Sequence, residues 1–252
     1  MEASEPLRYP WSQKSPIRGN LAIGNLRENI KKKLTTPRGV HVETLLTASG
    51  AVAGYAAQNA LWALSGLTPA TIPTSKPGQR PGNSEFAAVR VQSGDLFYFG
   101  DRLNAYLTGG HTKPDQFFLW GFVRGALSRL GVDSNALPDV GMMYSNVSKT
   151  VGTERFGFPT VPERHLPHLS ADQFIKAAWP FVRRIFVLPS PKGIADSEPL
   201  IEERHWPIIA SIVASQFMLS TKGHVEPLIG ATLVMEAAIA ASKIDPRAVG
   251  DS

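Results

Sequence analysis

The sequence contains no cysteine. Disulfides, thiolate metal sites and cysteine nucleophiles are therefore excluded, and the absence fits a cytoplasmic protein, which is the location we predict. The N-terminus also lacks the features of a secretory signal, because it carries Glu2 and Glu5 and has no apolar core segment.

The chain also lacks the short motifs that identify the common enzyme classes. It has no P-loop, no G-x-G-x-x-G, no G-x-S-x-G, no Ser-x-x-Lys and no H-E-x-x-H. These absences remove the usual nucleotide-binding, hydrolase and zinc-protease interpretations, while an enzyme of a rarer type stays compatible with the sequence. We predict that the protein uses no cofactor.

A concentrated charge of one sign is missing as well. The net charge is +5, but the basic residues are dispersed, and the one tight run is Lys31-Lys32-Lys33. A run of three lysines is typical of a solvated helix end, and no groove-reading motif accompanies it. We therefore expect no nucleic-acid partner. The sequence leaves other partners open, with a homo-oligomer as one alternative.

The stretch between Thr44 and Ser75 has no charged residue. It is long enough to cross a bilayer, but it is built from Ala, Gly, Ser and Thr, and it contains Gln58 and Asn59. We therefore predict a buried central helix over residues 42–65 rather than a membrane span. Both amides should then be hydrogen-bonded to backbone or to neighbouring side chains.

The amino-acid composition is that of a globular protein. Hydrophobic residues make up 43% of the 252 residues and charged residues 19%. We predict a mainly α protein of the α+β class, with an N-terminal arm and short helix over residues 1–40. A single large helical domain should follow over residues 41–246. Aromatic and β-branched residues around a glycine turn predict a small antiparallel hairpin near residues 85–100.

The helix over residues 42–65 and a second one over residues 226–243 should form the central pair, because both are apolar on most sides. We expect them to pack closely through small residues, namely Gly50, Gly54, Gly230 and Ala231. Replacement of Gly54 by leucine should then destabilise the fold by overpacking.

Local signals predict further helices. Thr112 with Pro114 should open a helix over residues 114–130, and Ser170 with Gln173 has the spacing of a capping box. Ser197 stands nine residues before Trp206-Pro207, just as Ser170 stands nine residues before Trp179-Pro180. Two similar bent helices, over residues 170–188 and 197–220, are therefore expected. Residues 132–169 are rich in turn-forming residues and predict no long element.

Two predicted helix starts have nearly the same sequence. His41-Val-Glu43-Thr-Leu-Leu matches His224-Val-Glu226-Pro-Leu-Ile. The two pairs could converge on one site, where imidazole and carboxylate suit acid–base chemistry or a metal. The alternative is local, because an acid in a first helical turn is favoured by the helix dipole and a preceding histidine can bond nearby backbone.

Three further acids are candidates for ligand binding. Asp95 and Asp101 each follow a glycine and bracket a short strand, which could place two carboxylates at its ends, although Gly-Asp is also ordinary turn chemistry. Glu236 lies in an apolar helix. If it is buried there it needs a partner, which we expect to be an arginine or a histidine.

Two histidine patterns could hold a metal. Glu202 and His205 share a helical face with Glu198, and His165 and His168 lie in a proline-rich loop. A solvated acidic face and a stiff surface loop are the interpretations we favour, since neither pattern supplies a complete ligand set. We predict no bound metal.

The segments HVETLLTASGAVAGYAAQ, GDLFYFGDRLNAYL and VMEAAIAASKIDP resemble those of an uncharacterised bacterial protein family. The resemblance covers about a third of the chain and implies no assigned activity. The sequence thus leaves two classes of function. The first is a soluble small-molecule-binding or protein-interaction protein. The second is an enzyme or sensor with a His/Glu site at the two matched helix starts.

Overall fold

A computed structural model of the protein describes residues 9–66, 87–109, 117–187 and 200–250. It shows a mainly helical fold with a small antiparallel hairpin, as the sequence predicts. The helices are α1 (Pro16–Leu34), α2 (Val42–Ser65), α3 (Asp101–Thr108), α4 (Leu119–Arg129), α5 (Val140–Thr150), α6 (Ala171–Val187), α7 (Trp206–Ser220) and α8 (Pro227–Ala241).

Two short antiparallel pairs accompany the helices. Strands β1 (Thr35–Thr36) and β2 (Gly39–Val40) join α1 to α2, and β3 (Ala87–Arg90) pairs with β4 (Leu96–Phe99). Single 3-10 turns are η1 (Ser134–Ala136), η2 (Glu163–His165), η3 (Glu203–His205) and η4 (Pro246–Ala248).

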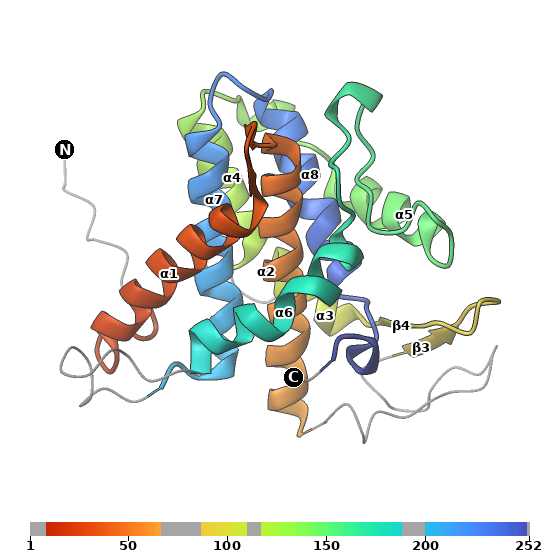
Figure 1. Ribbon diagram of the computed structural model, residues 1–252, viewed down its shortest axis with the longest axis horizontal. Helices are drawn as coiled ribbons and strands as arrows, with labels where there is room; N and C mark the ends of the chain where they lie inside the picture. The colour runs from red at the N-terminus through yellow and green to blue at the C-terminus, as the bar shows by residue number, and fades with distance from the viewer. Residues whose placement is uncertain (1–8, 67–86, 110–116, 188–199, 251–252) are drawn as a thin grey trace.

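Helix α2 is the centre of the fold. It begins after His41 and ends at Gly66, whose φ of 65° closes the helix in the left-handed conformation that glycine adopts without strain. Helices α7 and α8 lie along it, and α1, α3 and α6 also pack against it (Figure 1). Among the described residues, no helix is both long and apolar enough to cross a membrane.

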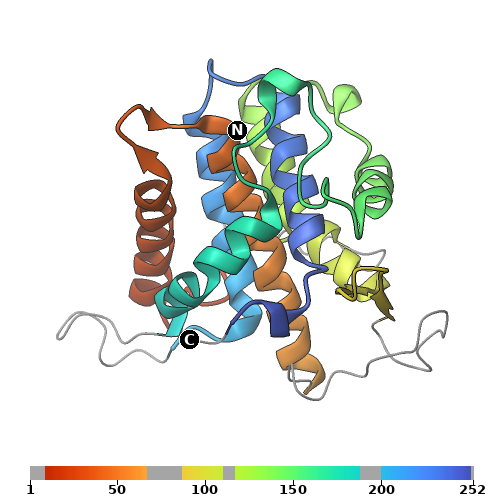
Figure 2. The same cartoon turned by 45° about the vertical axis from the view of Figure 1, so that its right-hand side comes forward.

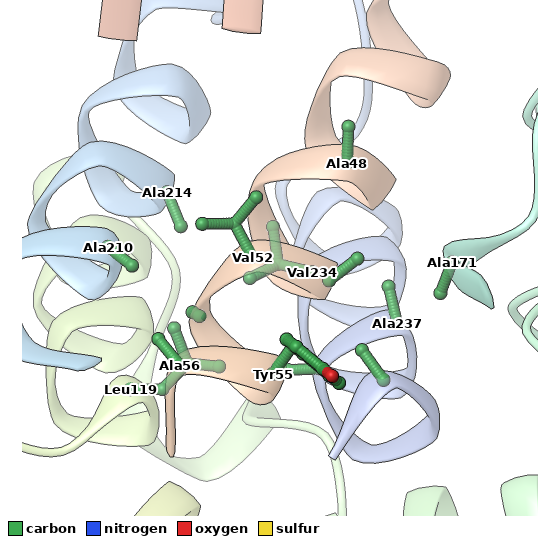
Figure 3. Packing of buried hydrophobic residues seen from close by; sticks show 14 of the residues in the cluster. Ala48, Val52, Tyr55, Ala56, Leu119, Ala171, Ala210, Ala214, Val234 and Ala237 are labelled. Carbon is green, nitrogen blue, oxygen red and sulfur yellow. The ribbon is translucent and has the colours of Figure 1, made fainter. Parts of the chain in front are cut away.

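Small side chains let the central helices approach one another. Figure 3 shows Val52 of α2 directed towards Ala214 of α7, with Val234 and Ala237 of α8 on the other side of α2. A Cβ added to Gly50 would overlap the carbonyl of Val234, and one added to Gly54 would overlap the carbonyl of Ala238. Gly54 follows Gly50 by four residues, and its neighbour Ala238 follows Val234 by four. Since both pairs advance in the same chain direction, α2 and α8 run parallel.

The predicted close packing of this pair is confirmed for Gly50 and Gly54, but the prediction was wrong for Gly230. A Cβ on Gly230 would meet only Leu46 Cδ1, at the ordinary contact distance of 3.6 Å. The close approach occurs one and two turns further along α8, because the parallel register places Val234 and Ala238 opposite the two glycines of α2.

The amide groups of Gln58 and Asn59 donate to backbone carbonyls, as the sequence predicts. Gln58 Nε2 donates to the carbonyl of Ile244 (2.9 Å), and Asn59 Nδ2 donates to the carbonyl of Tyr55 (2.8 Å). Strand β4 reaches the same segment, since the N–H of Tyr98 donates to the carbonyl of Lys243 (2.9 Å). The hairpin is therefore tied to the end of α8.

Three helices differ from the prediction: α5 was not expected, and α4 and α7 begin at other residues. The region 132–169 contains α5, which Asp139 caps by accepting from the N–H of Gly141 (2.7 Å). Helix α7 begins at Trp206, so Pro207 lies in its first turn and causes no bend there, because the proline needs no hydrogen bond at that position. Helix α4 begins at Leu119; Thr112, Pro114 and Ser197 lie outside the described residues.

Candidate functional site

The two matched helix starts lie at the same end of the molecule, because α2 and α8 run parallel (Figure 1, Figure 2). At the first start, His41 is the N-cap residue of α2. Its Nδ1 accepts from the N–H of Thr44 (3.4 Å) and lies 2.9 Å from Thr44 Oγ1. The histidine therefore supplies the cap that serine or aspartate provides in most helices.

Glu43 lies between two imidazoles. Its Oε2 is 3.3 Å from His41 Nε2, and its Oε1 is 2.9 Å from His165 Nδ1. The side chain is only 12% exposed. A carboxylate so covered needs a hydrogen-bond donor, which His165 supplies, and the His41 ring lies within ion-pair distance of the other oxygen.

The loop around η2 contributes the second imidazole and a third. His168 stacks on His41, with ring centroids 3.8 Å apart and planes 14° from parallel. The backbone N–H of His168 also donates to Thr44 Oγ1 (2.8 Å). The loop is thus attached to the first turn of α2 by one ring stack and two hydrogen bonds. We call His41, Glu43, Thr44, His165 and His168 the histidine cluster.

The second helix start forms the wall of an open cavity beside this cluster. The cavity has a volume of about 420 Å³, and its lining residues are Arg164, His165, Gly223, His224, Val225, Glu226 and Pro227. His224 and Glu226 are exposed, and the Glu226 side chain makes no capping bond. His165 belongs to both the cluster and the cavity, so it connects the two helix starts.

The contacts of His165 define which nitrogen carries its proton. Nδ1 faces Glu43 and donates to it, while Nε2 accepts from Arg164 Nε at 3.2 Å. A neutral ring with its proton on Nδ1 satisfies both contacts. The lone pair of Nε2 thus accepts from Arg164, a residue of the cavity wall.

His41 is in a different electrostatic position. Burial lowers its pKa below the ordinary 6.5; Glu43 opposes this shift and the neighbouring His168 adds to it. The neutral ring also keeps Nδ1 free to accept from Thr44. His41 is therefore suited to holding the helix start, whereas His165 bonds to Glu43 and Arg164 and lines the cavity.

The three other candidate acids lie elsewhere. Asp95 is exposed in the hairpin turn, where Ser93 Oγ donates to it (2.6 Å), and Asp101 is exposed in the first turn of α3. Asp95 lines an open cavity of about 580 Å³ between the hairpin and α6, and Asp101 does not. Two ion pairs lie in that cavity, Lys176 with Asp172 (3.4 Å) and Arg247 with Asp245 (3.0 Å).

Glu236 is almost fully buried on α8. Its Oε1 accepts from Asn146 Nδ2 (3.0 Å) and its Oε2 from the N–H of Thr160 (2.5 Å). The partner is therefore an amide and a backbone N–H, and not the arginine or histidine that we expected. These bonds attach α5 and the following loop to α8, which is a structural role.

Of the two metal patterns, Glu198 lies outside the described residues, and the described members do not meet as a ligand set. Glu202 pairs with Arg204 (2.7 Å), and the ring of His205 lies 6.0 Å from that of Trp11. Within the described ranges, no group of three or more histidine and carboxylate side chains is arranged to hold a metal ion.

The sequence suggests a shared site for His41, Glu43, His224 and Glu226. For His165 and His168 it allows a zinc loop and favours a stiff surface loop. Nothing in local spacing shows that this loop lies over the start of α2. Comparison of the chain with protein-family models, with curated protein sequences and with solved structures finds no match.

Proposed function

We propose that the protein binds a small polar molecule in the cavity where α2 and α8 begin, with His165 as its central contact. The observation that carries this proposal is the double role of His165. Glu43 holds one side of the ring, and the residue also lines the cavity together with Arg164, His224 and Glu226. A pre-oriented ring loses little freedom when a ligand binds.

The cavity has the size and chemistry of a metabolite site. Its volume of about 420 Å³ falls within the range that small-molecule sites occupy. Arg164 and His224 can donate to an anionic or carbonyl group, while Glu226 can accept from a hydroxyl or amine. We therefore expect a ligand that carries a carboxylate or carbonyl together with a hydrogen-bond donor.

A second candidate function is acid–base catalysis at the same site. It is favoured by the orientation of His165, whose Nδ1 donates to a carboxylate, while its Nε2 accepts from Arg164 and becomes a free base when Arg164 turns to the ligand. A carboxylate that orients an imidazole in this way strengthens it as a general base. The ligand would then be a substrate from which His165 removes a proton.

Ligand-observed NMR with a panel of hydroxy and amino carboxylates tests the binding proposal. We expect at least one compound to show saturation transfer with the wild type and to lose it in His165→Ala. His205→Ala is the matched control, because that histidine lines a different cavity. If every bound compound binds the two variants equally, the site is not at His165.

The same samples separate binding from catalysis. A bound compound that stays unchanged over hours supports a binding protein, whereas slow conversion supports the second candidate. Glu43→Gln should then lower the rate of conversion more than the affinity, because glutamine keeps the shape but offers a weaker hydrogen bond to His165.

A further inference from the structure

Lys243 is a buried amine in the interior of the fold. It follows the last turn of α8, and only 2% of the residue is exposed. Lysine is almost never buried to this degree unless a countercharge accompanies it. Its surroundings therefore require an explanation.

Several elements fix the position of this residue. The carbonyl of Lys243 accepts from the N–H of Tyr98 in β4, and the next carbonyl, that of Ile244, accepts from Gln58 of α2. The ammonium nitrogen lies 4.7 Å from the ring centre of Phe99 and 5.8 Å from that of Tyr144. The amine is thus held between two aromatic side chains, one from β4 and one from α5.

No described carboxylate pairs with this amine, and no described residue hydrogen-bonds to it. Glu236, seven residues earlier on α8, already accepts from Asn146 and Thr160. The pKa of Lys243 is lowered to about 8, and burial alone is the cause.

A second buried polar atom without a partner lies on α3, in a residue that bonds to Tyr144. Asn104 of α3 accepts from the Tyr144 hydroxyl through its backbone carbonyl (3.0 Å), but its side-chain Oδ1 is buried without a donor. The Tyr144 ring therefore faces an amine that no described carboxylate pairs with, and its hydroxyl bonds to the residue that carries the unpaired acceptor. Unpaired buried groups are rare, and they mark places that a ligand or a reaction can use.

We infer that Lys243 is a nucleophilic lysine that forms an imine with a small aldehyde or keto compound. The amine nitrogen adds to the carbonyl carbon, and a proton passes from nitrogen to the former carbonyl oxygen. Loss of water from this carbinolamine then leaves the C=N bond. No oxidant or metal is needed. A lysine desolvated among apolar side chains is the setting that activates an amine for this step.

The protonation state supports the inference. With a pKa of about 8, roughly a quarter of the amine is neutral at pH 7.5, against about one part in a thousand for a solvated lysine. Because the side chain is nearly covered, we expect two- and three-carbon carbonyl compounds to react and pyridoxal phosphate to be too large.

Reductive trapping tests the inference on the intact protein. Acetaldehyde or pyruvate is added with sodium cyanoborohydride at pH 7.5, and peptide mass spectrometry locates the resulting secondary amine. We expect Lys243 to be labelled at least tenfold faster than the exposed Lys149 and Lys222. Lys222→Met should leave the labelling unchanged, and Lys243→Met should remove the fast phase.

Lys243→Arg provides a second variant that keeps the positive charge but cannot form an imine, so it separates loss of the nucleophile from loss of the fold. Labelling of Lys149 and Lys222 with Lys243 unmodified would overturn the inference, as would equal rates at all three. His165→Ala should not alter the labelling, which keeps this test independent of the proposed binding site.

Discussion

Replacement of Gly54 by alanine tests the packing of the two central helices. Alanine normally stabilises a helix relative to glycine by about 1 kcal/mol. At Gly54, however, the added Cβ would overlap the backbone carbonyl of Ala238, so α2 and α8 would have to move apart. The substitution is conservative in size, and the sign of its effect depends only on this contact.

The magnitude follows from two opposing contributions. Overpacking of a well-packed core costs roughly 1–3 kcal/mol, and the obstacle here is backbone rather than a flexible side chain, which favours the upper end. Subtracting the helix-propensity gain of about 1 kcal/mol leaves an expected net loss of about 2 kcal/mol. Gly54→Leu should lose considerably more.

The assay is equilibrium unfolding in urea, with two matched controls. Gly24 of α1 has open space around it, and Gly230 of α8 has only Leu46 Cδ1 at 3.6 Å. Alanine at Gly24 should raise the free energy of unfolding by up to about 1 kcal/mol, and alanine at Gly230 should be neutral or mildly stabilising. If Gly54→Ala is as stable as these controls, the close parallel packing of α2 and α8 is refuted.

Three further predictions concern buried or half-buried polar groups. The pKa of Lys243 is about 8 in the folded protein, against 10.5 when solvated, so the unfolded chain binds more protons between these values. The wild type should therefore gain up to about 3 kcal/mol from pH 8 to pH 10.5, a gain that Lys243→Met lacks in parallel urea titrations. The pKa of His41 is lower in the folded protein than the ordinary 6.5. The unfolded chain therefore binds a proton at a higher pH than the folded one does, and the free energy of unfolding should decrease as the pH falls below about 6.5. His41→Asn keeps a good N-cap, and it should flatten that decrease in thermal melts; an unchanged pH profile would show that another group causes it. Glu236→Ala should cost about 1–3 kcal/mol, because the buried donors of Asn146 and Thr160 lose their acceptor. A change within error for Glu236→Ala in urea unfolding would mean that water replaces the carboxylate.

Features that depend on neighbouring residues could be predicted from the sequence alone. The central helix over residues 42–65, its end at Gly66 and the hairpin follow from local composition and turn chemistry. So does the capping box, in which Ser170 N donates to Gln173 Oε1 (3.0 Å) and Gln173 N donates to Ser170 Oγ (3.4 Å). Each involves groups only a few residues apart, so local conformation decides it. Helix α5 was missed because its glycine, serine and asparagine residues are typical of turns, while its apolar Met143 and Val147 are buried by packing.

The tertiary structure alone decided which distant groups meet. Glu43 and His165 are 122 residues apart, so their contact depends on how the η2 loop crosses the start of α2. The same holds for Lys243: that no described carboxylate reaches it results from the arrangement of β4 and α5 around its amine. The matched helix starts were visible in the sequence, but the parallel register of α2 and α8 brought them to one end. Chain connectivity places few limits on such long-range contacts, and it is burial of the whole apolar surface that selects among them.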